Sequence, residues 1–237
     1  MSKKSSILGR VGGFALAEML LAAAVVGLII ASAMPMLNRM ADDRASTQTA
    51  EEMKAFQEVA VAHLRANRAA YEAAMTNGTG AASLCKIGVA SDGSGGTTAN
   101  DTTLHTCATD VSMLLYLKAL PSTFKLKNAY GEQWVAIHRQ VYDGATYTGG
   151  IETLVVSAAV TTGGSALPAN NRRYQKAQAA AHASGGSAGV VPDTDRETCV
   201  AKRASTTYQI CGDGWKVNLA DYITAAQLTA FGNRLPN

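Results

Sequence analysis

The fold is decided close to the amino terminus, where residues 13–36 read GFALAEMLLAAAVVGLIIASAMPM. The stretch from Phe14 to Met36 has about the 20 residues that a membrane-spanning helix requires. Three basic residues and no acidic residue precede it: Lys3, Lys4 and Arg10. A cleaved secretory signal fits this arrangement, since Ala31-Ser32-Ala33 offers a small-residue cleavage site that would leave Met34 first. An uncleaved membrane anchor fits it as well.

Glu18 distinguishes these interpretations, because neither a signal nor a passive anchor has a use for a carboxylate there. An acidic side chain in a membrane helix costs up to a few kcal/mol at the centre and less near the end. Such a residue therefore indicates a function and a partner. The partner we predict is the free amine at Phe14 of a neighbouring subunit, which exists only if the chain is cut after Gly13.

The segment Gly13–Glu18 resembles the cleavage motif of type IV prepilins. In that family a peptidase cuts after the glycine, the new first residue is N-methylated, and a glutamate stands fifth, where this chain has Glu18. Gly27 and Pro35 fall fourteenth and twenty-second from Phe14, where many members carry glycine and proline. The resemblance implies a subunit held in the bacterial inner membrane and then built into an extracellular pilus filament. Its implied partners are the prepilin peptidase, other pilin subunits and a cell-surface receptor.

The small residues of the apolar stretch also have a physical meaning. Ala22, Ala23 and Ala24 with Gly27 form a helix face on which neighbouring helices can approach closely. Pro35 removes one backbone hydrogen bond and predicts a bend or interruption. Both residues are also tolerated in ordinary membrane helices, but that tolerance does not explain their register with Glu18.

The expected architecture is α+β and pilin-like: a long amino-terminal helix packed on an antiparallel sheet in a disulfide-bonded head. We predict a leader over residues 1–13, a helix over 14–77 with a membrane and polymerisation part over 14–36, and a globular head over 78–237. The helix becomes amphipathic after Pro35 and ends at Asn77-Gly78.

Within the head, a surface loop is expected over 78–100 and a helix capped by Asp110 reaching Leu120. Strands are predicted over 133–142 and 151–160, and a surface helix over 170–182. A hairpin is expected between 198–203 and 207–211, and a closing helix over 218–231.

The four cysteines are Cys85, Cys107, Cys199 and Cys211. An even number in an exported chain favours two disulfides. Zinc is the alternative, but no C-x2-C pair is present and only His105 lies near a cysteine. Of the three pairings, the local one, Cys85–Cys107 with Cys199–Cys211, is the simplest.

A second resemblance covers Thr49 to Leu235. The helical stretch 49–71, Asn128-Ala129-Tyr130-Gly131-Glu132-Gln133, the strand 152–156 and Gly185-Gly186-Ser187-Ala188-Gly189 are similar to the amino-terminal region of shufflon-type minor pilins of conjugative pili. In that family a variable tip-adhesin segment follows this region. With the chain stopping at Asn237, no such module is expected.

Other functions find little support in the sequence. Without the three leader cations, basic and acidic residues are equal at 18 each, so no nucleic-acid partner is expected. We predict no enzyme activity, no metal and no cofactor: Gly93-Ser94-Gly95-Gly96 lacks the ending of a phosphate loop, and the histidines lack metal spacing. Asp193, Asp195 and Glu197 are interpreted as a solvated turn rather than a Ca²⁺ site. A basic group is interpreted as surface rather than as a DNA site: Arg172, Arg173, Lys176, Lys202 and Arg203.

Two alternative functions remain. A type II secretion pseudopilin would form a short periplasmic filament. An exported, membrane-anchored binding protein would form none.

Overall fold

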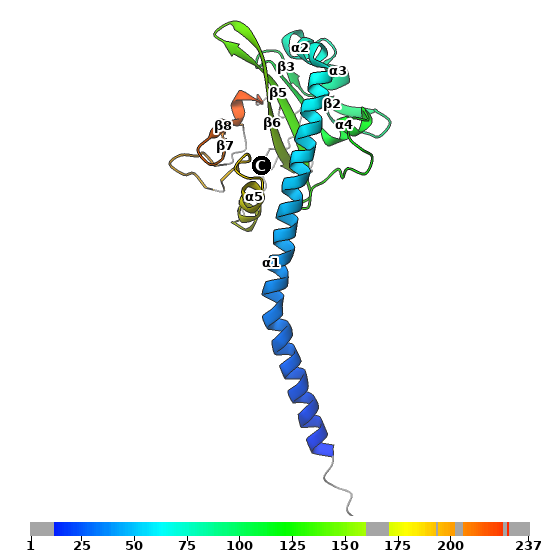
Figure 1. The fold of residues 1–237 in the computed structure, drawn as a ribbon, viewed down its shortest axis with the longest axis vertical. Coiled ribbons are helices and arrows are strands. Elements are labelled where there is room, and N and C mark those ends of the chain that lie inside the picture. Colours follow the sequence, from blue (N-terminus) through cyan, green and yellow to red (C-terminus); the bar gives the residue numbers. More distant parts are fainter. Residues whose placement is uncertain (1–11, 160–170, 193, 202–205, 225–226, 228–237) are drawn as a thin grey trace, which may run out of the picture. The chain divides into compact units, whose positions relative to one another are not determined.

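A computed structural model describes residues 12–159, 171–192, 194–201, 206–224 and 227 (Figure 1). The chain divides into two compact units, Met1–Arg44 and Ala45–Asn237. We call the second unit the head. The predicted leader lies outside the described residues except for Gly12 and Gly13.

One helix, α1 (Gly12–Ala66), contributes to both units. We call residues 12–44 its apolar half and residues 45–66 its head half. The helix continues through Pro35, so an interruption there is wrong, while the alternative that we predicted, a bend, stays a prediction. A proline removes one hydrogen bond from the ladder, and the helix formers on either side are enough to maintain the rest.

The long helix is instead broken at Asn67, after which α2 (Arg68–Asn77) begins. The Asn67 amide is shared between the carbonyls of His63 and Leu64, at 3.1 and 3.2 Å. Its side chain also donates to the His63 carbonyl. This local competition for backbone acceptors is typical of asparagine. The predicted end is confirmed: Gly78 adopts a left-handed conformation and its N–H bonds to Ala74 O.

The head is built on a four-stranded antiparallel sheet in the order β3-β4-β5-β6. Its strands are β3 (Asn100–Asp101), β4 (Thr106–Asp110), β5 (Glu132–Asp143) and β6 (Thr146–Ala159). The predicted hairpin over 133–160 is confirmed with longer strands and a shorter turn at residues 144–145. The sequence pattern does not predict β4, because this strand is short and buried throughout, with no alternation.

Each face of β5 packs against a different part of the head. Trp134 and Ala136 lie in a cluster with Phe56 and Ala60 of α1. Val135 and Ile137, on the opposite face, contact a cluster from the carboxy-terminal region that includes Tyr208. Alternating residues of a strand point to opposite faces, so the sheet forms a central layer between the head half of α1 and the carboxy-terminal segment.

Residues 78–100 are not the predicted continuous loop. They contain α3 (Ala81–Leu84) and a hairpin of β1 (Lys86–Val89) with β2 (Gly95–Thr98). The Gly-rich composition concealed the strands, because glycine contributes no side chain to an alternating pattern.

Asp110 caps α4 (Val111–Tyr116) as predicted, accepting from Met113 N at 2.9 Å. The helix stops before the predicted Leu120, because Lys118 adopts a left-handed φ of 57°. The amides of Ala119 and Leu120 both return to Leu114 O.

The carboxy-terminal region is partly as expected. A helix, α5 (Asn171–Ala183), is confirmed. The predicted 198–211 hairpin is wrong, because β7 (Gln209–Cys211) pairs with β8 (Lys216–Asn218), while Val200 contributes only one backbone bond, to Gln209. The start of the predicted closing helix is a single turn, η1 (Leu219–Asp221); residues 225, 226 and 228–231 lie outside the described part.

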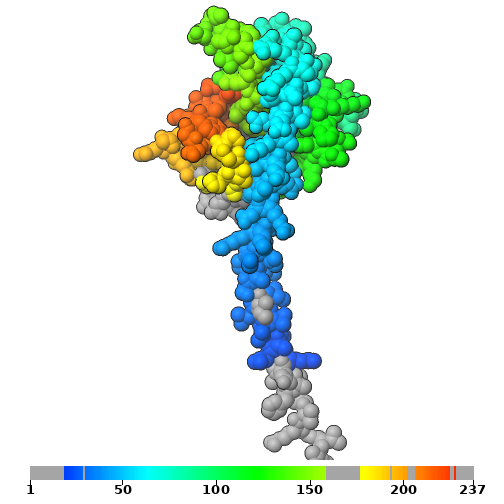
Figure 2. Space-filling model, in the orientation of Figure 1, coloured from blue at the N-terminus to red at the C-terminus, as the bar shows by residue number. Residues whose placement is uncertain are grey.

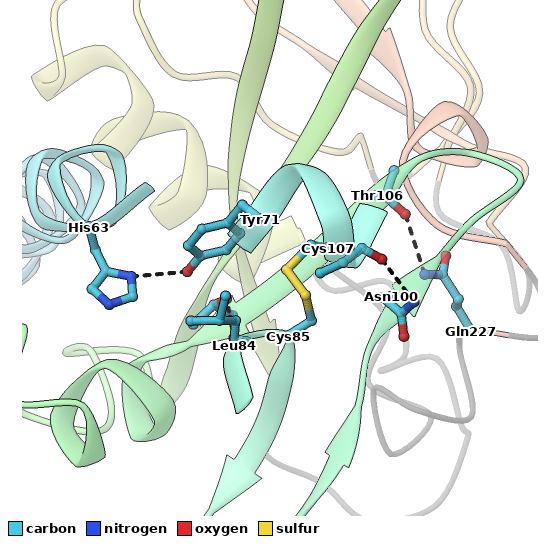
Figure 3. The surroundings of a disulfide bond; sticks show 10 residues. His63, Tyr71, Leu84, Cys85, Asn100, Thr106, Cys107 and Gln227 are labelled. Atoms are coloured by element: carbon cyan, nitrogen blue, oxygen red, sulfur yellow. Dashed lines mark hydrogen bonds between the residues drawn. A yellow bond between two sulfur atoms is a disulfide. The ribbon is translucent and has the colours of Figure 1, made fainter. Parts of the chain in front are cut away.

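Both local cysteine pairs form disulfides. Cys85 joins Cys107 with Cα atoms 5.1 Å apart, and Cys199 joins Cys211 at 6.3 Å. The first bond is buried beneath Tyr71 and Leu84 (Figure 3). The fold is therefore α+β, with a long apolar amino-terminal helix, antiparallel sheets and two disulfides.

Candidate functional site

The apolar half of α1 exposes a series of large hydrophobic side chains. Exposure is highest at Met19, at 78%, and Leu28, at 73%, and it extends to Met40. Figure 2 shows the side chains of this blue segment projecting from the helix. Soluble chains rarely leave a continuous apolar surface of this extent uncovered. A surface of this kind is suited to contact with lipid or with other helices.

Its length suits either environment. From Met19 to Met40 the helix rises about 33 Å, close to the roughly 30 Å of a bilayer core. Among the described residues, this is the one helix apolar and long enough to cross a membrane. The apolar stretch is followed by charged residues: Arg39, Asp42, Asp43 and Arg44. An anchor and a signal share these properties, so length alone does not separate them.

Gly13, Phe14 and Glu18 all lie within the first turns of α1. Residues four apart on a helix lie on one face, one turn from each other, which puts Phe14 and Glu18 in that relation. Their side chains lie outside the described part of the chain. The pairing of Glu18 with a Phe14 amine stays a prediction.

No contact within the described part of the chain requires a glycine at position 27. A Cβ added at Gly27 would meet no atom within 4 Å. The neighbouring Ala22, Ala23 and Ala24 are also exposed. Small residues that nothing in the chain requires are typical of a face that a second helix approaches.

In the head half of α1, by contrast, large apolar side chains are buried. Phe56 is 0% exposed and Ala60 1% exposed, against Trp134 and Ala136 of the sheet. The Phe56 ring also contacts Phe124, with centroids 6.4 Å apart. Burying one such aromatic side chain stabilises the fold by about 1.5–3 kcal/mol. Phe56 and Ala60 of this half are thus already buried inside the head.

Asp110 connects three elements of the head through its buried carboxylate. Beyond capping α4, it accepts from Gly88 N of β1 at 2.8 Å and from Gln133 Nε2 of β5 at 2.9 Å. A buried carboxylate requires such bonds, because losing them would leave a charge without compensation. The sequence predicted the capping role of Asp110. It did not predict the hydrogen bonds that Asp110 accepts from β1 and β5.

A second polar group, around Tyr71, was not anticipated. The Tyr71 hydroxyl lies 3.0 Å from His63 Nδ1 (Figure 3), and the Tyr71 ring meets the His138 ring edge-on at 5.1 Å. His138 is fully buried, with Nδ1 2.9 Å from Thr153 Oγ1. Burial, and to a smaller extent the charge of His63, lowers the pKa of His138 to about 3. Burial also lowers the pKa of His63.

His138 packs in the core, and His63 is half-buried against the Tyr71 ring. His138 Nε2 has no hydrogen-bond partner among the described residues. A neutral imidazole buried in a strand is compatible with packing at neutral pH, and it makes stability sensitive to acid.

One groove of about 300 Å³ lies on the head, between α1 and β6. It combines an apolar floor with polar and basic margins, formed by Gln57, Val61, Leu64, Arg65, Arg68, Ile151 and Thr153. It contains no pair of acid and base groups of the kind that catalysis requires. Its volume is at the lower limit for small-molecule pockets.

The acidic turn near the carboxy terminus has a structural role where it is described. Asp195 accepts from Ala201 N at 2.9 Å, and Asp193 lies outside the described residues. Across the described ranges, no group of three or more His, Cys, Asp or Glu side chains could hold a metal ion. Of the basic group considered for DNA, Lys202 and Arg203 and the side chains of Arg172, Arg173 and Lys176 lie outside the described part.

Comparison with known protein families, with curated proteins and with solved structures gives no match. The function must therefore be argued from the residues themselves.

Proposed function

We propose that this chain is a structural subunit of a type IV pilus, assembled through the apolar half of α1 after removal of its leader. The observation that carries the proposal is a helix that leaves residues 19–28 and 30–40 exposed and begins with the Gly13-Phe14 to Glu18 spacing. An anchor explains the exposure but not the acid. A polymerising helix explains both.

The proposed assembly step is electrostatic. Cutting after Gly13 frees an ammonium group at Phe14, and burying that charge unpaired among apolar helices costs several kcal/mol, on the order of the effective penalty for one ion. Glu18 of a neighbouring subunit neutralises it. Because a charge pair has one favourable geometry, the same contact fixes the axial register between helices.

The apolar side chains supply the remaining contacts. Before assembly they face lipid, and in the filament they face other helices, so their environment stays apolar. Association then depends on close packing rather than on the hydrophobic effect. The face of Ala22, Ala23, Ala24 and Gly27 allows that close approach.

The head is the part that the filament presents outward. Its disulfides suit an oxidising compartment outside the cytoplasm. In this proposal the subunit resides in the inner membrane first and in the extracellular filament afterwards, where its head takes part in adhesive or conjugative surface contact.

The amino terminus of the mature chain tests the proposal. Intact-mass and terminal-peptide spectrometry of membrane and filament material should find a start at Phe14 with a methylated amine. Gly13→Leu, which alters only the cut site, should leave the chain uncut. A start at Met34 would identify a secretory signal, and an intact Met1 a permanent anchor; either result would overturn the proposal.

A further inference from the structure

The segment between the start of α4 and the end of the α4–β5 loop is unusual in charge and exposure. Residues 111–131 contain Lys118, Lys125 and Lys127 and no acidic residue. They also contain both large hydrophobic side chains that are exposed in the described part of the head, Tyr116 at 43% and Leu126 at 51%. We call Lys125-Leu126-Lys127 the basic tripeptide.

The basic tripeptide is held between two contacts with α1. On one side, Phe124 packs against Phe56. On the other, the Tyr130 hydroxyl lies 2.8 Å from Ser46 Oγ. Asn128 fixes the intervening turn by accepting from the amides of Tyr130 and Glu132, at 2.9 and 3.0 Å. The loop is therefore fastened along the head half of α1, as Figure 1 also shows for its course from α4 to β5.

Between these contacts, Lys125, Leu126 and Lys127 are all exposed. Neither lysine forms an ion pair with another described residue, since the ion pairs there are Arg68–Glu72 and Arg139–Glu152. Figure 2 shows the green segment that contains them on the molecular surface beside α1. Two unpaired ammonium groups flanking an exposed leucine match the chemistry of an anionic bilayer surface.

Chain connectivity keeps such a surface within reach. Ser46, which contacts the loop, follows Leu37 by nine positions, and nine residues span at most about 30 Å even when fully extended. If residues 14–36 lie in a bilayer, as the proposed function requires, Ser46 cannot lie farther than this from Leu37 at the edge of that segment. A soluble acidic partner would have to be recruited, whereas the bilayer is always present.

We propose that Lys125, Leu126 and Lys127 form a docking site for the anionic headgroups of the membrane that holds the subunit before assembly. The lysines attract acidic phospholipid, and Leu126 enters the headgroup boundary. This inference rests on the proposed function. It assigns the loop to the unassembled state, in which the docked head is held at the membrane until the subunit enters the filament.

The experiment uses the full chain in lipid nanodiscs, with an environment-sensitive fluorophore on Leu126→Cys. The native cysteines are paired in disulfides, so the new thiol alone is labelled. Headgroup-proximal brominated lipid serves as quencher, in phosphatidylcholine with or without phosphatidylglycerol. The control probe is on Ala145→Cys, at the far end of β5 from Glu132, about 35 Å along the strand.

Quenching is expected at position 126 in phosphatidylglycerol discs and not in neutral discs, and not at position 145 in either. The double substitution Lys125→Gln, Lys127→Gln should reduce the contact equilibrium about fivefold for each lysine. The matched pair Lys86→Gln, Lys216→Gln, exposed or half-exposed elsewhere on the head, should leave the contact unchanged.

Three results would overturn the site while leaving the proposed function intact, provided the chain resists carbonate extraction. They are equal quenching in neutral discs, no quenching at position 126, and crosslinking of position 126 to a second subunit in place of lipid. A chain that carbonate extracts from the membrane would instead overturn the proposed function, and the site with it.

Discussion

In the apolar half of α1, Leu28 is 73% exposed and Val25 51%, whereas in the head half Phe56 is 0% and Ala60 1% exposed. One continuous helix thus carries two kinds of apolar surface. The head half buries its side chains against its own sheet and stabilises the fold. The apolar half leaves its side chains exposed, and in the proposed function they contact lipid or other subunits. Hydrophobicity alone does not distinguish these roles; the presence of a covering sheet does.

The strongest test of this comparison is Glu18→Ala. Filament yield should fall by about a hundredfold, because an incoming Phe14 ammonium group loses the partner that offsets a penalty of several kcal/mol. Membrane insertion should persist, because removing an acid favours the bilayer. Sheared-filament yield and the membrane pool are measured separately. Glu58→Ala, an exposed acid in the head half, is the control; wild-type incorporation of the Glu18 variant would refute the pairing.

Substitution in the head half should lower the stability of the head rather than filament assembly. Phe56→Ala should reduce the free energy of unfolding of the head by about 3–5 kcal/mol, since it leaves a cavity against Trp134 and Phe124. Membrane insertion should not change. Leu28→Ala, the matched truncation in the apolar half, should leave head stability unaltered. Denaturation followed by near-ultraviolet circular dichroism measures head stability in both variants. Equal losses of stability from Phe56→Ala and Leu28→Ala would contradict the division of α1 into two functional halves.

The disulfides should matter only to the head. Replacing both members of either pair by serine should lower head stability by about 3 kcal/mol in the chain-entropy model, with sequence separations of 22 and 12 residues. Membrane insertion again should not respond. Non-reducing peptide mapping of the wild type checks the connectivity first, and a peptide joining Cys107 to Cys199 would contradict the structure.

Mild acid, one pH unit below 6.5, should weaken the head selectively and by the smallest of these amounts. The folded pKa of His138 is about 3, below its ordinary value of 6.5, so the unfolded chain binds more protons between those values. Stability is therefore full above about pH 6.5 and declines on acidification by at most about 1.4 kcal/mol per pH unit. His63 shifts in the same direction.

The control for this pH dependence is His138→Phe, which keeps an aromatic ring beside Tyr71. It should flatten the slope of stability against pH between 6.5 and 3, as measured by urea denaturation at several pH values. An unchanged slope would assign the acid sensitivity to other groups.

Individual elements differ in how far the sequence predicted them. The β5–β6 hairpin was foreseen because Trp134, Val135, Ala136 and Ile137 suit a buried strand. The β1–β2 hairpin was not, because its glycines carry no side-chain pattern. Asn67 was overlooked as a helix break, since its effect comes from a side chain and backbone sharing the His63 carbonyl. Pro35 was given too much weight, because one missing hydrogen bond does not end a helix supported on both sides.

The sequence by itself determined the long helix, its apolar half and the Gly13 to Glu18 spacing, and it favoured the local cysteine pairs as the simplest of three pairings. These are properties of near neighbours along the chain, where helical periodicity and loop length operate directly. Tertiary structure alone decided the strand partner of Gln209–Cys211, the three-way binding of Asp110 and the burial of His138 beside Tyr71. Those features depend on which distant segments meet. Local pattern does not specify that meeting, because many pairings bury similar apolar area and only the complete packing selects one.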